Sequence, residues 1–247
     1  MSALPLPTRR DEAWRYSDLE ALARIWPVAA PEPLTVAEGQ AHSIELLQDA
    51  PDDAVVIEDH TILLMPGSRL DVKLLNIGGK LGRVSFDVIL HRGAHFELAA
   101  AQIGGGEQTL EIVTTVRHLE PDARSNQTIR SVLAGHATGN ALGRIEVARG
   151  AVGTDAAQSV KAILLDRTAT ANARPELEIF ADDVKCAHGA TVGELDRTAL
   201  FYLASRGLAP DAARTLLIEA FIAGLFDGAE REEDYRAAGL AKLRGLG

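Results

Sequence analysis

The chain has 247 residues, which fits one large domain or a core with small additions. It carries 25 Lys and Arg against 35 Asp and Glu, a net charge of −10 that argues against nucleic acid and anionic membrane surfaces as partners. Hydrophobic residues make up 47% and aromatic residues only 4%, so we expect an aliphatic core, and the single cysteine, Cys186, excludes an intrachain disulfide or an all-cysteine metal site.

The chain shows no membrane or export signal. No stretch reaches the roughly 18 consecutive apolar residues of a membrane span. Residues 1–8 lack the basic and apolar regions of a secretory signal. We therefore expect a cytoplasmic protein, because a lone thiol stays reduced in that compartment.

The first region, residues 1–53, is predicted to contain an N-terminal helix and a connector. Apolar residues spaced three and four apart, from Trp14 to Trp26, indicate an amphipathic helix over residues 9–26. Pro27 ends this helix, and residues 27–53 show little regular pattern.

The second region, residues 54–193, is predicted to be a β-core. Short apolar or alternating runs, separated by Gly, Asp, Asn and Pro, predict strands at 54–57, 61–64, 72–77, 84–90, 96–100, 110–116, 129–133, 143–148, 160–165 and 177–180. No helical pattern interrupts them, which excludes alternating strands and helices. A small-Ala-small turn recurs at Ala94, Ala123, Ala151, Ala169 and Ala187. The recurrence and the aliphatic composition favour a β-solenoid over a sandwich or a barrel.

The third region, residues 194–247, is predicted to be a helical domain. Asp196 is a good N-cap for a helix over residues 197–206, and Gly207 suits its C-terminal end. Pro210 and Asp211 begin the next helix, which is expected to run to about residue 226. Because this helix is apolar nearly all round, we expect it to be buried in its own domain or under a partner. An acidic block and a short terminal helix follow.

Cys186 and His188 are the strongest candidates for chemistry. Residues two apart in an extended strand face the same side, so thiolate and imidazole could bind one iron or zinc ion, with further ligands from a second chain. A buried cysteine beside a surface histidine in a metal-free interaction protein is an alternative. Another is a Cys-dependent hydrolase on a β-solenoid, with Asp182 or Asp183 as the acid. The close spacing disfavours the hydrolase, because catalytic partners are usually distant in sequence.

The sequence around these residues resembles the SufB/SufD family of SUF iron–sulfur cluster assembly. The resemblance rests on PELEIFADDVKCAHGATVG at residues 175–193, on PTRRDEAWRYSDL at residues 7–19, and more generally on residues 130–228. SufB chains carry His-Glu-Ala-Thr and a further upstream cysteine. This chain has His-Gly-Ala-Thr at residues 188–191 and one cysteine, so it is similar to SufD rather than SufB. The chain is short for the family, and we expect the region before the β-core to be the part that is shortened.

The resemblance implies a fold, a function and partners. The fold is a right-handed parallel β-helix core with an N-terminal helix and a C-terminal helical domain. The function is that of a non-catalytic scaffold subunit that pairs with SufB, docks the SufC ATPase, and helps iron delivery and cluster assembly at the SufB–SufD interface. The isolated chain is expected to hold no cofactor tightly and to be able to form a homodimer through its solenoid edge.

The same resemblance assigns residues to two sites. Cys186 and His188 are implied to form part of a metal site at the SufB interface, where iron or an iron–sulfur cluster is bound transiently and shared with SufB. His188 is the stronger candidate ligand. The SufC-docking residues are implied to be Leu216, Leu217, Ala220, Phe221 and Leu225.

Overall fold

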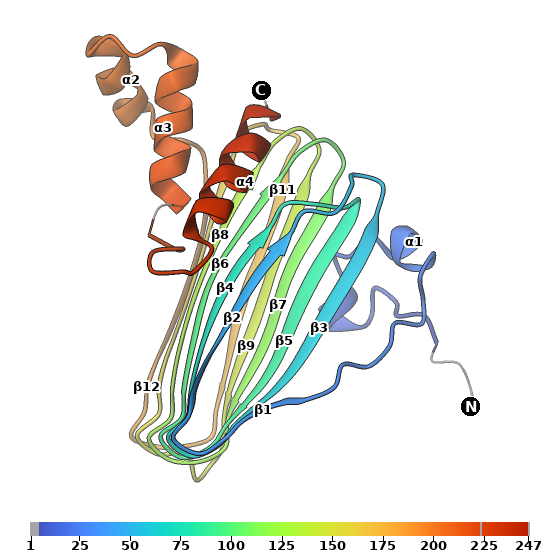
Figure 1. Ribbon diagram of the computed structural model, residues 1–247, viewed down its shortest axis with the longest axis vertical. Coiled ribbons are helices and arrows are strands. Elements are labelled where there is room, and N and C mark those ends of the chain that lie inside the picture. Colours follow the sequence, from blue (N-terminus) through green and yellow to red (C-terminus); the bar gives the residue numbers. More distant parts are fainter. Residues whose placement is uncertain (1–4, 223, 247) are drawn as a thin grey trace.

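The computed structural model describes residues 5–222 and 224–246, so part of the segment over which no secretory signal was expected lies outside the described residues. Two six-stranded parallel sheets face each other, and successive strands of the chain alternate between them. Figure 1 shows the strands stacked side by side in one direction as the coils of a parallel β-solenoid. The predicted fold class, a solenoid core with an N-terminal helical segment and C-terminal helices, is confirmed.

The strands are regular in length along most of the solenoid. The first sheet contains β1 (Leu34–Val36), β3 (Val55–Leu64), β5 (Leu81–Leu90), β7 (Thr109–His118), β9 (Thr138–Val147) and β11 (Thr170–Ile179). The second sheet contains β2 (Ala41–Gln48), β4 (Arg69–Asn76), β6 (His95–Gly104), β8 (Arg124–Leu133), β10 (Asp155–Leu164) and β12 (Lys185–Gly193).

The core lies between the two sheets and follows the alternation of each strand. In β5, Val84, Phe86, Val88 and Leu90 point inward, and the same phase continues through the paired residues of the neighbouring strands. Phe86 and Phe96 are the two aromatic side chains among the buried residues of the main core cluster. The remainder is Leu, Val, Ile and Ala, as the low aromatic content predicted.

The repeating element of the solenoid is a left-handed turn residue rather than an alanine. The turns that lead from the first sheet to the second place residues with φ between 53° and 74° above one another, at Gly39, Gly67, Gly93, Asp122, Gly153 and Asp183. Of the predicted alanine turns, Ala94 and Ala123 occupy equivalent positions, immediately before strands that pair in register. Ala151, Ala169 and Ala187 do not, so the predicted recurrence was only partly correct.

The predicted connector over residues 27–53 is wrong, because β1 and β2 lie within it. β2 is an edge strand of the second sheet, and most of its side chains are exposed or only partly covered. Ile44 and Leu46 pack against the core while the first residues of the strand are exposed. This partial burial leaves a weak alternation that did not distinguish the strand from a loop.

The C-terminal helices are α2 (Arg197–Ser205), α3 (Pro210–Ile222) and α4 (Glu232–Arg244). The predicted cap is present, since the Asp196 side chain accepts a hydrogen bond from the Thr198 amide, 2.8 Å away. α3 ends earlier than predicted, and Leu225 and Phe226 turn back into a cluster on the outer face of the second sheet with Tyr235 of α4. Within residues 5–222 and 224–246, no helix is long and apolar enough to cross a membrane.

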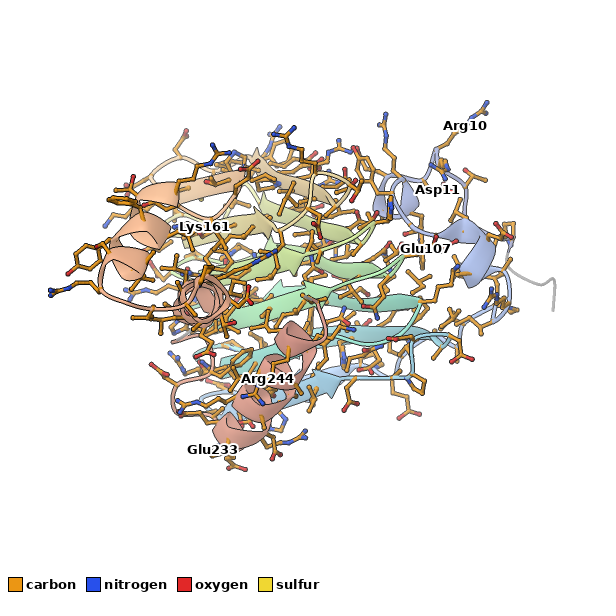
Figure 2. The ribbon with its side chains drawn as sticks, turned by 90° about the horizontal axis from the view of Figure 1, so that it is seen from above. Arg10, Asp11, Glu107, Lys161, Glu233 and Arg244 are labelled. Carbon is orange, nitrogen blue, oxygen red and sulfur yellow. The ribbon has the colours of Figure 1, made fainter. Side chains whose placement is uncertain are left out.

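The N-terminal segment forms only a 3-10 turn, η1 (Glu12–Trp14), and one short helix, α1 (Leu19–Leu22), so the predicted helix over residues 9–26 is wrong. Side chains of the first sheet take the backbone carbonyls that a longer helix would need. Arg83 donates to the Ala13 carbonyl at 2.9 Å, and Asn140 donates to the Tyr16 carbonyl at 3.1 Å. Figure 2 shows this segment, marked by Arg10 and Asp11, on a different side of the solenoid from α4 with Arg244.

A buried ion pair fastens this segment to the first sheet. Arg83 and Glu111 lie 2.5 Å apart with side chains 3% and 1% exposed. Glu111 also accepts hydrogen bonds from Ser17 at 2.8 Å and Asn140 at 2.9 Å, and Trp14 covers the guanidinium with its ring centroid 3.8 Å away. The charges are therefore removed from water, but each has several partners.

We expect Glu111→Ala to lower the free energy of unfolding by about 3–5 kcal/mol, because it leaves Arg83 charged and unpaired in a buried site. Urea denaturation followed by circular dichroism measures the change. As a control, Asp234→Ala removes the partner of Arg231 in a pair whose side chains are 44% and 61% exposed, and it should cost about 1 kcal/mol or less. Equal costs for the two variants would contradict a role of the buried pair in holding the segment.

Candidate functional site

Cys186 and His188 lie on β12, the last strand of the solenoid. β12 pairs with β10 on one side only, and the register places Cys186 beside Ala156 and His188 beside Gln158. Ala156 and Gln158 are 1% and 2% exposed in the interior. The structure therefore places Cys186 and His188 on the inward-facing side of the terminal coil.

No further coil of the described chain covers these side chains. We call the inward-facing residues of the last two strands the end layer: Ala171, Ala173, Pro175, Leu177 and Ile179 of β11, with Cys186, His188, Ala190 and Val192 of β12. Ile179 and Val192 are 40% and 45% exposed. The outer edges of both strands lack a partner strand in the described structure, so the open end exposes apolar side chains and unpaired backbone groups together.

Cys186 is half-buried and is held as a neutral thiol. It packs with Leu177 and Val184 against the buried residues Ile145, Val147 and Ala156. Burial raises the pKa of the Cys186 thiol, the nearby carboxylate of Asp155 raises this pKa further, and a hydrogen bond with the Ala156 backbone opposes them. A metal ion bound here has to displace the thiol proton.

His188 is exposed, and no hydrogen bond joins its ring to Cys186 or to any other described side chain. The hydrolase alternative therefore lacks the nucleophile–base contact that it needs. Asp183, a candidate acid in that alternative, instead belongs to the column of left-handed turns. Its carbonyl accepts the Gly153 amide at 2.9 Å.

The donor chemistry of Cys186 and His188 fits iron. Thiolate and imidazole both ligate iron and zinc. In the described part of the chain, no group of three or more His, Cys, Asp and Glu side chains is arranged to hold a metal ion.

Gln158 is a residue of this site that the sequence interpretation missed. It lies immediately next to His188 in the register and is almost completely buried. A signal was present, because Ala156, Val160 and Ala162 share the inward phase of β10 with Gln158. Gln158 is the polar residue among inward-facing residues of β10 that are otherwise small or apolar, and this difference indicates a buried polar group.

The implied docking residues divide between surface and core. Leu216 is 45% exposed and Ala220 is also exposed, whereas Leu217 and Phe221 are half-buried and Leu225 is 5% exposed. The neighbouring helix α2 has no buried residue and exposes Phe201 and Tyr202 by 75% and 57%. Figure 1 shows α2 standing beside α3, away from the solenoid.

Comparison with known proteins places the chain in a family. Residues 34–221 match the family model described as SUF system FeS cluster assembly, SufBD core domain. The chain is 36% identical to the chloroplastic protein ABCI7 of Arabidopsis thaliana over 62% of this chain and 33% of that protein. It is 35% identical to an iron-sulfur cluster assembly SufBD family protein of Synechocystis, over 65% of this chain and 36% of the relative. The chain therefore belongs to the SufBD family of SUF iron–sulfur cluster assembly proteins.

Within this family, the chain is also similar to the iron-sulfur cluster assembly protein SufD of Escherichia coli. The two are 36% identical over 53% of this chain and 30% of the relative. The matched stretch amounts to about a third of the length of each of these relatives.

We expect Asp155→Asn to speed the alkylation of Cys186 by iodoacetamide at pH 8. Removing the carboxylate lowers the thiol pKa, and the thiolate is the reacting form. Because Cys186 is the single cysteine, mass spectrometry of the intact chain reports the rate without interference. The pH–rate profile should shift to lower pH.

Asp183→Asn is the matched control, since it removes a carboxylate close in sequence and keeps a side chain that tolerates positive φ. Its alkylation rate should equal that of the unmodified chain. Equal rates for the Asp155 variant and the unmodified chain would contradict the electrostatic role of Asp155.

Proposed function

We propose that this chain is a scaffold component of iron–sulfur cluster assembly that pairs with SufB and docks the SufC ATPase, and that it is not itself an enzyme. The observation that carries the proposal is the position of Cys186 and His188 together on the inward face of a terminal coil that no other strand of the described residues covers. Side chains in that position can reach a ligand only through the open end of the solenoid.

In this function the chain contributes part of a binding site for iron or a cluster as cargo. His188 offers a ring nitrogen, and Cys186 offers a thiolate after it loses its proton. The partner supplies the remaining ligands, so no cluster is held tightly by the isolated chain. This division of ligands accounts for a site with two donors and no third in the described residues.

Pairing with SufB is supported by the open end itself. The unpaired edges of β11 and β12 can accept hydrogen bonds from a partner strand, and the exposed Ile179 and Val192 add apolar contact. Without SufB, a second copy of this chain can use the same edges, which supports a homodimer in isolation. A reducing compartment such as the cytoplasm suits the role, because Cys186 has to stay a free thiol.

Docking of SufC is proposed at the outer face of α2 and α3. Phe201, Tyr202 and Leu216 are large and exposed, and they lie on two helices that contact each other, of which α3 also contacts β8. Ala220 and Leu216 also line a groove of about 330 Å³ between α3 and α4. Leu217, Phe221 and Leu225 support this surface from behind, since they are partly or fully buried.

Replacing His188 tests the metal role. In the complex with SufB and SufC, His188→Ala should lower the yield of assembled cluster at least tenfold, because the interfacial site loses a ligand. The readout is cluster absorbance and iron content per purified complex. The thermal unfolding midpoint should stay unchanged, since the side chain is exposed.

The matched control is His136→Ala, another exposed histidine, on a turn outside the end layer. It should leave the cluster yield at its original level. A folded His188→Ala complex with full cluster yield would refute the metal role of this chain.

Charges on the helical surface test the docking assignment. Phe201→Glu and Leu216→Glu should each weaken SufC binding by about 2 kcal/mol or more, because exposed apolar anchors of an interface lose their contacts. Both side chains are exposed, so the chain should remain folded. Calorimetric titration with SufC measures the change.

Leu119→Glu serves as control, because Leu119 is 43% exposed on the turn between β7 and β8, at the opposite end of the strands from α2. It should leave SufC affinity unchanged. Retained affinity in both helix variants would move the docking site elsewhere.

A further inference from the structure

A short polar cluster lies inside the solenoid directly beneath the end layer. On the second sheet, the register stacks Leu98, Gln127, Gln158 and His188 in one inward-facing column. The column is apolar in the earlier coil and polar in the last three. Gln127 and Gln158 are 0% and 2% exposed, so both amides are out of contact with bulk water.

The hydrogen bonds of this cluster hold the Gln158 amide to residues of the preceding coils. The Thr114 hydroxyl donates to Gln127 Oε1 at 2.6 Å. Nε2 of Gln158 donates to the same Oε1 at 3.3 Å and to Thr114 Oγ1 at 3.4 Å. Gln158 thus directs its amide nitrogen toward the preceding coils, and its Oε1 is left buried without a hydrogen-bond partner.

The amide of Gln158 also has a fixed place. A Cβ atom at position 143 on the opposite sheet would lie 1.7 Å from Gln158 Nε2, so the amide fills the space that Gly143 leaves free. An amide that is confined by packing and hydrogen-bonded on one side presents its other polar atom in a defined position. The next residue of the column beyond that atom is His188.

We propose that Gln158 is a positioning residue for His188: its Oε1 accepts a hydrogen bond from one ring N–H and leaves the other ring nitrogen free to bind iron. This inference rests on the proposed function. Histidines that bind metals almost always donate their second ring N–H to a carbonyl or carboxylate, which sets the tautomer and the ring orientation. Adjacent strands are about 4.8 Å apart, so the ring of His188 reaches the amide when it turns over the end layer.

The proposal explains why a buried carbonyl oxygen is left without a partner in the uncovered chain. In the structure His188 is exposed and makes no hydrogen bond with a described side chain. A partner that covers the end layer excludes water from both groups, and their hydrogen bond then satisfies the buried acceptor. The partner that covers the end layer thus also brings about the hydrogen bond that orients the His188 ring.

Co(II) titration of the complex with SufB tests the proposal, with Co(II) as the probe and its visible absorption as the readout. Gln158→Leu keeps the approximate volume and removes the acceptor. It should weaken Co(II) binding about 10- to 100-fold and alter the absorption spectrum. Gln158→Glu keeps an acceptor but loses the two donor contacts of Nε2, so it should weaken Co(II) binding less than Gln158→Leu does.

Gln127→Leu is the matched control, because Gln127 is equally buried in the same cluster but is one coil further from His188. It should lower the thermal unfolding midpoint as Gln158→Leu does, while Co(II) affinity stays unchanged. If Gln158→Leu does not fold, Gln158→Met takes its place, since it also removes the carbonyl acceptor.

His188→Ala separates the two possible failures. Loss of Co(II) binding in this variant, with full binding in Gln158→Leu, would overturn the positioning role and leave the proposed function intact. Unchanged binding in His188→Ala would overturn the metal role itself. Equal weakening by Gln127→Leu and Gln158→Leu would show that Gln158 acts only through packing, which also overturns the proposal.

Discussion

Parallel pairing in register is the constraint on which the rest of the molecule depends. Each residue of a coil lies beside the residue at the equivalent position of the next coil. All residues of such a column therefore face the same side of the sheet. The column that contains Leu70 and Phe96 continues through Ser125 and Ala156 to Cys186. Cys186 therefore occupies a core position in the last coil of the described structure. The register that buries the equivalent residues of earlier coils therefore leaves the Cys186 thiol accessible at the end of the solenoid.

The same constraint assigns the outward-facing columns to the segments that cover the sheets. On the first sheet, Arg83 and Glu111 are outward-facing residues of paired strands, and they are buried because the N-terminal segment lies over them. On the second sheet, the outward-facing Leu75, Ala101 and Ile103 are buried by the end of α3 and by α4. The two additions thus protect opposite faces, and among the described residues neither of them covers the end of the stack formed by β11 and β12.

Local patterns in the sequence predicted the elements whose signals are local. Alternation identified the central strands, and the Asp196 cap and Gly207 identified α2, because both signals come from residues that are neighbours in the chain. The N-terminal helix was wrong because residues distant in sequence, Arg83 and Asn140, take its carbonyls. The pairing of Cys186 and His188 on one face followed from the strand period. The uncovered end required the stacking order of the coils, whereas the burial of Gln158 was indicated by the alternation within β10 but was missed.

Interior polar groups were hard to predict, because their residue type does not indicate burial and only the apolar neighbours on the same face of the strand do. His118 is one example, because it is fully buried beside Ser125 and burial lowers its pKa to about 4. His118 is therefore neutral across the physiological range. The two histidines differ in burial, because His118 lies within the stack and His188 lies at its end.

The space shared by Gly143 and Gln158 has a consequence for how such chains can diverge. The two positions lie on opposite sheets and divide one volume between them, so a larger residue at 143 requires a smaller one at 158. Their substitutions should therefore be correlated among relatives, even though no backbone hydrogen bond of the solenoid links the strands that carry them. A relative with a side chain at the first position and a short residue at the second would have lost the amide beneath its histidine. The residues at positions 143 and 158 would then distinguish relatives that have a buried amide beneath this histidine from relatives that lack it.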